Sequence, residues 1–199
     1  MNFPTALRIP AKVWATRYFS HPIARVLLAL HIGPNLLTFA GFLVACAAAW
    51  LLAEGVILWG GVVMLAGAVM DMFDGAVARL GGKASVFGAF FDSVMDRLGE
   101  AVVLVGIGVY YTREGHELGV LLAFGALVAS VMVSYTRARA EGLGIEGDVG
   151  VLGRPERIVV LGAGLLSGFV LWALGIIAAV AGLTVLQRIW YVWKRAPRA

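Results

Sequence analysis

Charged side chains are scarce in this 199-residue chain, in which only 14% of the residues are Asp, Glu, Lys or Arg and 61% are apolar. The mean hydropathy is +0.90. A soluble domain has to cover its surface with polar side chains and does not reach such values. The composition therefore excludes an ordinary water-soluble enzyme and indicates that a lipid bilayer is the solvent for most of the chain.

Cysteine and histidine are rarer still, with one and three residues. Cys46 has no second cysteine to pair with and lies in an apolar stretch, where we expect it to be a small packing residue. The histidines, His21, His31 and His116, belong to no recognisable ligand motif. A site built on His or Cys ligands, as zinc and copper prefer, is therefore not predicted.

Apolar stretches long enough to cross a bilayer are abundant. Leu36–Ala53 and Leu118–Tyr135 each hold 18 uncharged residues, about the length that spans a hydrocarbon core of roughly 30 Å. Two further apolar segments lie between them in the sequence. Ile158–Gln187 holds 30 uncharged residues and would be about 45 Å long as one helix, too long for a single span, so we expect a turn at Ser167-Gly168. These segments predict six membrane-spanning helices.

The distribution of Lys and Arg supports six spans. One side of the bilayer then receives nearly every basic residue, whereas Arg113 is the single Lys or Arg on the other side. Basic loops face the cytoplasm by the positive-inside rule. This topology also explains the basic balance of the chain, so nothing indicates a nucleic-acid partner. The basic side comprises the N-terminal arm, the 79–85 and 137–157 loops and the C-terminus.

The N-terminal arm, residues 1–34, mixes basic and apolar residues and has no clean apolar core of a secretory signal. This pattern predicts an amphipathic helix lying on the membrane surface. Residues 35–199 would form the membrane domain. The expected fold is thus an all-α integral membrane protein with six transmembrane helices plus an N-terminal amphipathic juxtamembrane helix.

Four aspartates interrupt the apolar background. Asp71 and Asp74 close the second expected span, and Asp92 and Asp96 lie in the first turns of the third. Residues three or four apart share one helical face, so each helix presents a pair of carboxylates in one direction. Because the link between the two helices is short, we expect the pairs to face each other near the cytoplasmic boundary of the membrane.

Clustered carboxylates in a membrane need a cation. A charge at mid-membrane costs about 2.5–3.5 kcal/mol on insertion scales and less near the interface. Mg²⁺ and Mn²⁺ suit carboxylate oxygens, and Mg²⁺ typically joins one or two carboxylates to substrate phosphate and water. Salt bridges to Arg79, Lys83 and Arg97 are the structural alternative, and a cation transporter is the alternative from another functional class. Arg97 and Glu100 are expected either to support the groups that bind the ligands or to pair helices, rather than to act in catalysis.

The sequence around the aspartates reads Asp71-Met-Phe-Asp74-Gly75-Ala-Val-Ala78-Arg79, then eight residues, then Gly88-Ala-Phe-Phe-Asp92-Ser-Val-Met-Asp96. It resembles the signature of the CDP-alcohol phosphotransferases, DxxDG, AR and GxxxDxxxD, with every signature position filled. The six-span outline matches that family over essentially the whole chain. The resemblance implies a metal-dependent membrane enzyme of phospholipid biosynthesis, in a family that is commonly dimeric, with its active site facing the cytoplasm.

The resemblance also implies roles for individual residues. Asp71, Asp74, Asp92 and Asp96 would ligate Mg²⁺ or Mn²⁺, as two ions, and Asp96 would also take the proton from the incoming hydroxyl. Small residues would let a flat nucleotide approach the helices, and Arg79 would neutralise its diphosphate. The residues expected to bind the CDP-linked donor are Pro34, Asn35, Leu36, Leu37, Asp71, Asp74, Gly75, Ala78, Arg79, Ser85 and Gly88.

Two later segments concern the acceptor alcohol. Ser134-Tyr-Thr-Arg137-Ala-Arg139-Ala-Glu141 and Gly153-Arg154-Pro-Glu156-Arg157 are similar to the SYxKARAE and RPER segments of phosphatidylinositol phosphate synthases. That subgroup joins CDP-diacylglycerol to inositol 1-phosphate, although Arg137 stands where it often has lysine. The residues expected to hold the acceptor phosphate are Ser134, Arg137, Arg154, Arg157 and Arg188.

Other acceptors and donors remain open from the sequence. Phosphatidylglycerophosphate synthases of the same superfamily use glycerol 3-phosphate, and archaeal-type relatives use ether-lipid donors or soluble CDP-inositol. The Gly-rich segment 142–153 reads as a flexible cytoplasmic connection. The predicted function is thus transfer of a phosphatidyl group from CDP-diacylglycerol to inositol 1-phosphate, by a homodimeric enzyme in the lipid bilayer.

Overall fold

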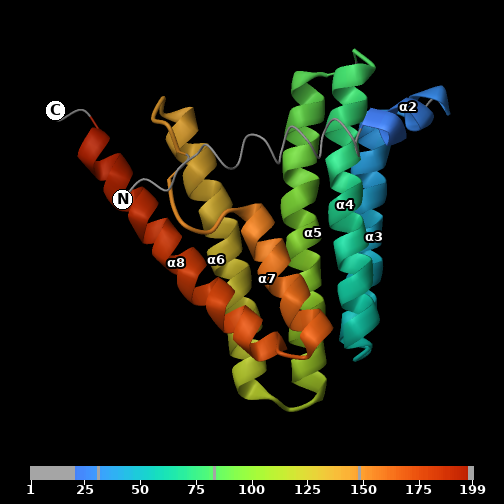
Figure 1. Cartoon of the computed structure of the whole chain (residues 1–199). Coiled ribbons are helices and arrows are strands. Elements are labelled where there is room, and N and C mark those ends of the chain that lie inside the picture. The colour runs from blue at the N-terminus through green and yellow to red at the C-terminus, as the bar shows by residue number, and fades with distance from the viewer. Residues whose placement is uncertain (1–20, 31, 83, 148, 197–199) are drawn as a thin grey trace. The chain divides into compact units, whose positions relative to one another are not determined.

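The computed structural model describes residues 21–30, 32–82, 84–147 and 149–196. Within these ranges the regular secondary structure is entirely helical, with seven α-helices and no strand (Figure 1). The helices are α2 (His21–Ala29), α3 (Pro34–Ala53), α4 (Ile57–Leu80), α5 (Val86–Arg113), α6 (Glu117–Gly142), α7 (Arg154–Ser167) and α8 (Val170–Arg195).

The long uncharged run divides where the sequence predicts. Helix α7 ends at Ser167, Gly168 adopts the left-handed conformation with φ of 80°, and α8 begins at Val170. A glycine accepts this conformation without the steric cost that a Cβ atom would bring. The expected turn at Ser167-Gly168 is therefore confirmed, and six helices follow α2.

Four helices are long and apolar enough to cross a membrane: α3, α4, α6 and α8. Their length and composition are those of an integral membrane protein. Helix α5 is longer, with 28 residues, or about 42 Å, but its first half carries several charged side chains. Helix α7 has 14 residues, or about 21 Å, which is shorter than a typical hydrocarbon core of roughly 30 Å.

The chain divides into two compact units, one of residues 1–43 and 66–96 and the other of residues 44–65 and 97–199. In the first unit, α2 packs on α3 and α4 through a small apolar cluster centred on Ala24, Leu37, Ala76 and Val77. Of the expected N-terminal arm, residues 1–20 lie outside the described residues and 21–29 form α2.

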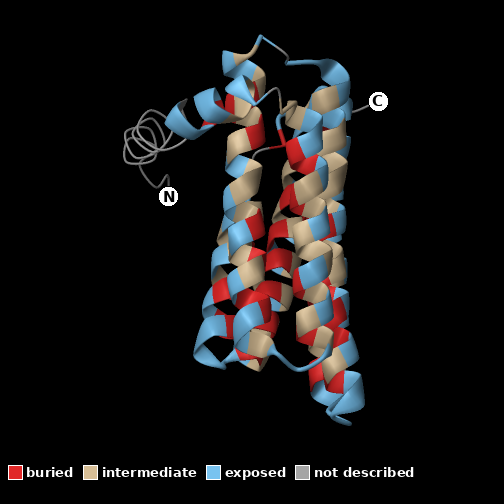
Figure 2. Ribbon diagram, turned by 90° about the vertical axis from the view of Figure 1, so that its right-hand side faces the viewer, coloured by how far each residue is buried: buried red, intermediate tan, exposed pale blue. Residues whose placement is uncertain are grey.

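The second unit contains a larger core in which α8 packs along α6 and α7 (Figure 1). Glycine permits the closest approaches. A Cβ on Gly106 of α5 would lie 2.4 Å from the Ala49 carbonyl oxygen of α3. Along each helix, buried residues alternate with a broad set of exposed apolar ones, as expected for helices that face lipid (Figure 2).

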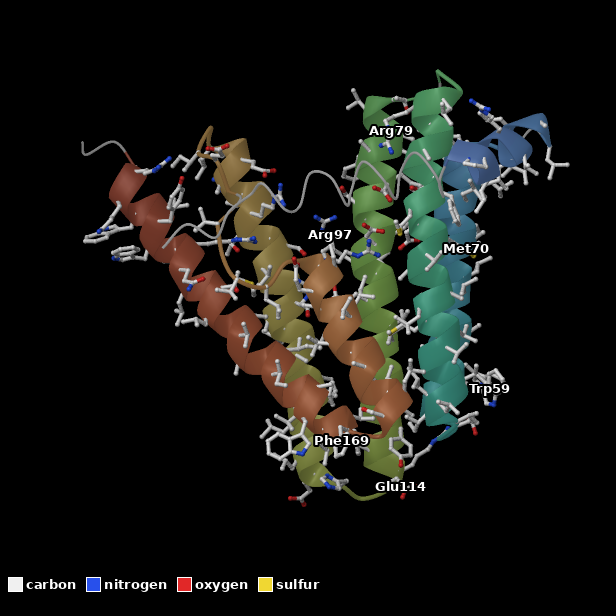
Figure 3. The ribbon with its side chains drawn as sticks, viewed as in Figure 1. Trp59, Met70, Arg79, Arg97, Glu114 and Phe169 are labelled. Atoms are coloured by element: carbon white, nitrogen blue, oxygen red, sulfur yellow. The ribbon has the colours of Figure 1, made fainter. Side chains whose placement is uncertain are left out.

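Three turns lie at one end of the second unit. Trp59, Glu114 and Phe169 mark the turns between α3 and α4, α5 and α6, and α7 and α8 (Figure 3). An exposed ion pair, Arg113 with Glu54 at 3.0 Å, ties two of the turns together. The expected topology placed these same three turns on one side of the membrane.

Candidate functional site

A pocket of about 200 Å³ opens in the first unit. The start of α3, the last turns of α4 and the start of α5 form its walls. Its lining combines charged and polar side chains with glycine and alanine, a combination that suits a flat, charged ligand. The lining residues are Pro34, Asn35, Thr38, Asp74, Gly75, Ala78, Arg79, Ala84, Ser85, Gly88, Ala89 and Asp92.

Glycine keeps the walls of this pocket close together. A Cβ on Gly88 would lie 3.0 Å from Ser85 Oγ and 3.2 Å from Asn35 Oδ1, so the starts of α3 and α5 meet at this point. Ser85 Oγ also accepts a hydrogen bond from the Gly88 backbone N–H at 3.0 Å, in the first turn of α5. Arg79 lies near the C-terminal end of α4, where its side chain is exposed (Figure 3).

Asp74 is the buried acid of the pocket, only 6% exposed. Its Oδ2 accepts a hydrogen bond from Thr38 Oγ1 of α3 at 2.8 Å, and its Oδ1 accepts one from the Gly75 backbone N–H. Asp92 and Asp71 are near enough for their charges to act on Asp74. Three like charges repel one another strongly where water is scarce, so this arrangement favours a bound cation.

Asp71 and Asp96 do not line the pocket. Asp71 lies one turn before Asp74 on α4, and a Cβ on Gly41 of α3 would lie 2.5 Å from its Oδ1. The glycine therefore leaves the space that this carboxylate fills. Asp96 is half-buried on α5, and like Asp71 and Asp92 it interacts with other groups of the protein.

The donor set of the pocket fits a hard divalent cation. Within the described residues, no three His, Cys, Asp or Glu side chains converge tightly enough to form a complete metal cage. The pocket instead presents two carboxylates, those of Asp74 and Asp92. Mg²⁺ is commonly held by one or two carboxylates, with phosphate and water completing its shell.

Most residues expected to bind the CDP-linked donor line this one pocket. The exceptions are Asp71, which lies against Gly41, and the two leucines of α3. Leu36 is 59% exposed, whereas Leu37 is buried in the apolar cluster beneath α2. Successive residues of a helix point about 100° apart, so neighbours of Asn35 cannot all face the same pocket.

The residues expected to hold the acceptor phosphate all belong to the second unit. Ser134 is half-buried on α6, and the exposed Arg137 one turn later pairs with Glu141 at 2.8 Å. Arg154 is the first residue of α7 and is half-buried. These three side chains remain accessible to a ligand.

Arg157 and Arg188 are buried and engaged with the protein. Arg157 forms a two-bond ion pair with Glu100 of α5. Arg188 of α8 donates through Nε to the Val149 carbonyl at 2.6 Å and through Nη1 to the Val133 carbonyl of α6. Both arginines therefore link elements of the second unit.

The Gly-rich segment 142–153 is anchored to α8. The Leu152 backbone N–H donates to Thr184 Oγ1 at 3.3 Å, and the Leu152 side chain packs in an apolar cluster with Val133 and Ala181. The Arg188 bond to Val149 adds a second attachment. The prediction of a flexible connection is wrong for this part of the segment, because buried contacts hold it.

Several residues of the site were missed or undervalued by the sequence analysis. Thr38 and Thr184 are polar residues within otherwise apolar spans, a signal that marks them but names no partner. Gly41 is one of 26 glycines and carries no signal of its own. Helix pairing was one of the two roles expected for Glu100, and its bond to Arg157 of α7 confirms that role.

Comparison with known proteins identifies a family and several similar proteins. A profile of the CDP-alcohol phosphatidyltransferase family matches residues 31–192. The archaetidylinositol phosphate synthase of Methanothermobacter thermautotrophicus is 41% identical over 185 residues, which cover 90% of this chain and 91% of that protein. The phosphatidylinositol phosphate synthase of Mycolicibacterium smegmatis is 37% identical over 182 residues, covering 85% and 82%.

Among solved structures, the chain is similar to a phosphatidylinositol phosphate synthase. The phosphatidylinositol phosphate synthase of Mycobacterium tuberculosis, 30% identical, has been crystallised with CDP-DAG bound, and that structure matches with a TM-score of 0.83 over 91% of this chain and 98% of its own. Its complex with manganese and citrate matches with a TM-score of 0.85 over 91% and 93%.

Proposed function

This chain belongs to the CDP-alcohol phosphatidyltransferase family, and from that membership we propose that it transfers the phosphatidyl group of CDP-diacylglycerol to inositol 1-phosphate. The products are phosphatidylinositol phosphate and CMP. The observation that carries the proposal is the pocket of the first unit, in which Asp74, Asp92 and Arg79 surround a space bordered by glycine and alanine. Family membership also favours a transferase over the alternative function, a cation transporter.

The pocket accounts for the donor. Gly75, Ala78 and Gly88 leave room for the cytidine, with Asn35 and Ser85 as polar neighbours, and the Arg79 guanidinium binds the diphosphate. Asp71, Asp74, Asp92 and Asp96 complete the proposed site as metal ligands. Crystals of the Mycobacterium tuberculosis relative with CDP-DAG and with manganese support a CDP-linked donor and a divalent metal as the ligands of this site.

The chemistry follows from the charges that the reaction creates. Mg²⁺ or Mn²⁺, proposed as two ions, would neutralise the diphosphate and make its lipid-side phosphorus more electrophilic. The Asp96 carboxylate accepts the proton of the acceptor hydroxyl while that oxygen forms a bond to the phosphorus. The bond from phosphorus to the bridging oxygen breaks, and CMP leaves with the negative charge that Arg79 offsets.

The acceptor phosphate is assigned to the basic residues of the second unit. Ser134, Arg137 and Arg154 are accessible, and Arg157 and Arg188 lie buried in the same unit. A neutral acceptor such as free inositol needs no such residues, whereas a phosphate dianion does. Both curated relatives described above are named for an inositol phosphate lipid, which supports inositol 1-phosphate as the acceptor.

The membrane setting is part of the proposal. We assign α3 to α8 as six spans of the cytoplasmic membrane, with α5 crossing despite its charges because its acids serve the site. The basic loops place the site on the cytoplasmic side, where both substrates would be available. A homodimer formed through the exposed apolar faces of the helices is the proposed assembly.

The decisive experiment measures CMP release by the full-length protein in detergent with CDP-diacylglycerol and Mg²⁺. Inositol 1-phosphate, glycerol 3-phosphate and free inositol are compared as acceptors. Release with inositol 1-phosphate alone is expected, EDTA should abolish it, and excess Mg²⁺ or Mn²⁺ should restore it. Asp96→Asn should lower kcat by about 100-fold or more, the usual contribution of a general base. CMP release with glycerol 3-phosphate and with neither of the other acceptors would overturn the assignment of inositol 1-phosphate as the acceptor.

The same assay should also compare CDP-diacylglycerol with a second donor. The relative from Methanothermobacter thermautotrophicus is named for an archaetidyl product, so an ether-linked CDP-lipid is the natural comparison. The same enzyme preparation is assayed with each donor at equal concentration and with inositol 1-phosphate held constant. A kcat/KM higher for the ether-linked donor would reassign the lipid tail and leave the chemistry of the site unchanged.

A further inference from the structure

Glu100 has no role in the reaction proposed above, yet it forms a buried two-bond ion pair with Arg157 in the second unit. Arg157 Nε donates to Glu100 Oε1 at 2.6 Å, and Arg157 Nη2 donates to Oε2 at 2.7 Å. The side chains are 1% and 10% exposed. Two parallel bonds of this kind fix the plane of a guanidinium as well as its position.

The remaining terminal nitrogen of Arg157 has a different environment. Nη1 is shielded from water and has no hydrogen-bond partner among the residues that the structure describes. A buried N–H of a charged group costs free energy when it lacks an acceptor, and such groups in proteins normally meet an oxygen. The Arg157 guanidinium is therefore hydrogen-bonded to Glu100 through Nε and Nη2, whereas Nη1 lacks an acceptor.

We propose that Glu100 is a positioning residue for the acceptor, holding Nε and Nη2 of Arg157 so that Nη1 is presented to an oxygen of the acceptor phosphate. The inference rests on the proposed function, because it takes Arg157 as a phosphate-binding residue. The carboxylate also cancels much of the arginine charge. What Glu100 contributes is thus the direction of a hydrogen-bond donor and not attraction of the anion.

Three roles for Glu100 give different kinetics. A positioning residue, once altered, raises KM for the acceptor and leaves KM for the donor unchanged. A residue that competes with the phosphate for Arg157 would lower the acceptor KM when its charge is removed. A contact that only joins α5 to α7 would lower the melting temperature with no selective change in either KM.

The test substitutes Glu100→Gln in the full-length protein, which keeps the size of the side chain and removes its charge and one acceptor oxygen. We expect KM for inositol 1-phosphate to rise about tenfold, as for the loss of one charge-assisted hydrogen bond, while KM for CDP-diacylglycerol stays constant. Glu54→Gln is the matched control, because it makes the same change in the exposed pair with Arg113. A lower acceptor KM, or equal changes in both KM values, would overturn the proposal.

Two additions separate positioning from folding. If Glu100 acts through Arg157, adding Glu100→Gln to Arg157→Lys should raise the acceptor KM no further, whereas additive effects would contradict the proposal. If the Gln variant does not fold, Glu100→Asp retains the charge but is too short to keep both bonds. It should show the same selective rise, and an unchanged acceptor KM in a folded Asp variant would count against the proposal.

Direct binding keeps this inference distinct from the choice of acceptor. Calorimetric titration of the wild-type protein and the two Gln variants with inorganic phosphate requires no turnover. Affinity reduced about tenfold by Glu100→Gln and unaffected by Glu54→Gln supports positioning, even if inositol 1-phosphate proves not to be the acceptor. Equal affinity in all three proteins, or no binding by the wild type, would refute it.

Discussion

The hydrogen bond between Thr38 and Asp74 joins two buried polar side chains, 5% and 6% exposed, in an otherwise apolar setting. A carboxylate that is to bind a cation has to be held in one orientation before the cation arrives. Groups that hydrogen-bond to metal ligands supply this restraint in many metal sites. Thr38 supplies this restraint for Asp74, and it also lies in the lining of the same pocket.

We therefore predict that Thr38→Val, which preserves the shape of the side chain, raises the Mg²⁺ concentration for half-maximal CMP release. Loss of such a partner typically weakens a metal site by roughly 10- to 100-fold. The measurement is a Mg²⁺ titration of the initial rate at saturating substrates. Thr112→Val is the control, because the Thr112 hydroxyl bonds to the Gly108 carbonyl of its own helix at 2.8 Å. Identical titration curves for the two variants would contradict the role of Thr38.

Gly88 carries a second prediction at the residue scale. Its missing side chain leaves the space between Ser85 Oγ and Asn35 Oδ1 in the pocket wall. Gly88→Val would fill that space, so we expect KM for CDP-diacylglycerol to rise at least about tenfold, the equivalent of a modest overpacking cost. KM for the acceptor should not change.

The control for Gly88 is the same substitution at Gly182 of α8, where a new Cβ would meet no atom within 4 Å. Gly182→Val should leave both KM values at the wild-type level. A donor KM that is unchanged in Gly88→Val would show that this wall does not contact the nucleotide.

At the scale of the helices, the turn at Gly168 decides whether the last uncharged run is one helix or two. Its φ of 80° suits glycine, and no neighbouring atom fills the space beside it. Gly168→Ala should destabilise the protein by about 1–2 kcal/mol, because an L-residue resists this conformation. Gly175→Ala, equally unobstructed but inside α8, should be neutral or stabilising. Thermal unfolding in detergent would compare the two, and equal melting temperatures would contradict the account of this turn.

The helix boundaries were predictable because local chemistry sets them. Apolar runs end at charged residues or glycines, and α3 begins at Pro34 and α7 ends at Ser167, as the sequence indicated. Contacts between helices were not predictable from spacing, since they depend on which face of one helix meets another. The partnership of Thr38 with Asp74, the fit of Asp71 beside Gly41 and the anchoring of Leu152 by Thr184 are of this kind.

For the whole molecule, the acids and the bilayer impose opposite demands. Most of the surface of the helices is apolar, as a protein in lipid requires, whereas α5 alone carries Asp92, Asp96, Arg97 and Glu100. Such charges are tolerated in a membrane protein when they face protein, water or a ligand. Three of these four charges, Asp92, Asp96 and Glu100, are thus residues that the proposed chemistry and acceptor positioning require.

Six spans and a cytoplasmic site give a testable arrangement of the loops. In a Cys46→Ser background, which removes the one native thiol, Glu114→Cys, Glu146→Cys and Arg195→Cys place single thiols in the second unit. All three positions are exposed. A membrane-impermeant maleimide should label the first in intact cells and the other two only after permeabilisation, because the positive-inside rule puts the basic loops and the C-terminus in the cytoplasm. Labelling of Arg195→Cys in intact cells would require an odd number of spans. Helices α7 and α8 could then not both cross the membrane as two antiparallel spans.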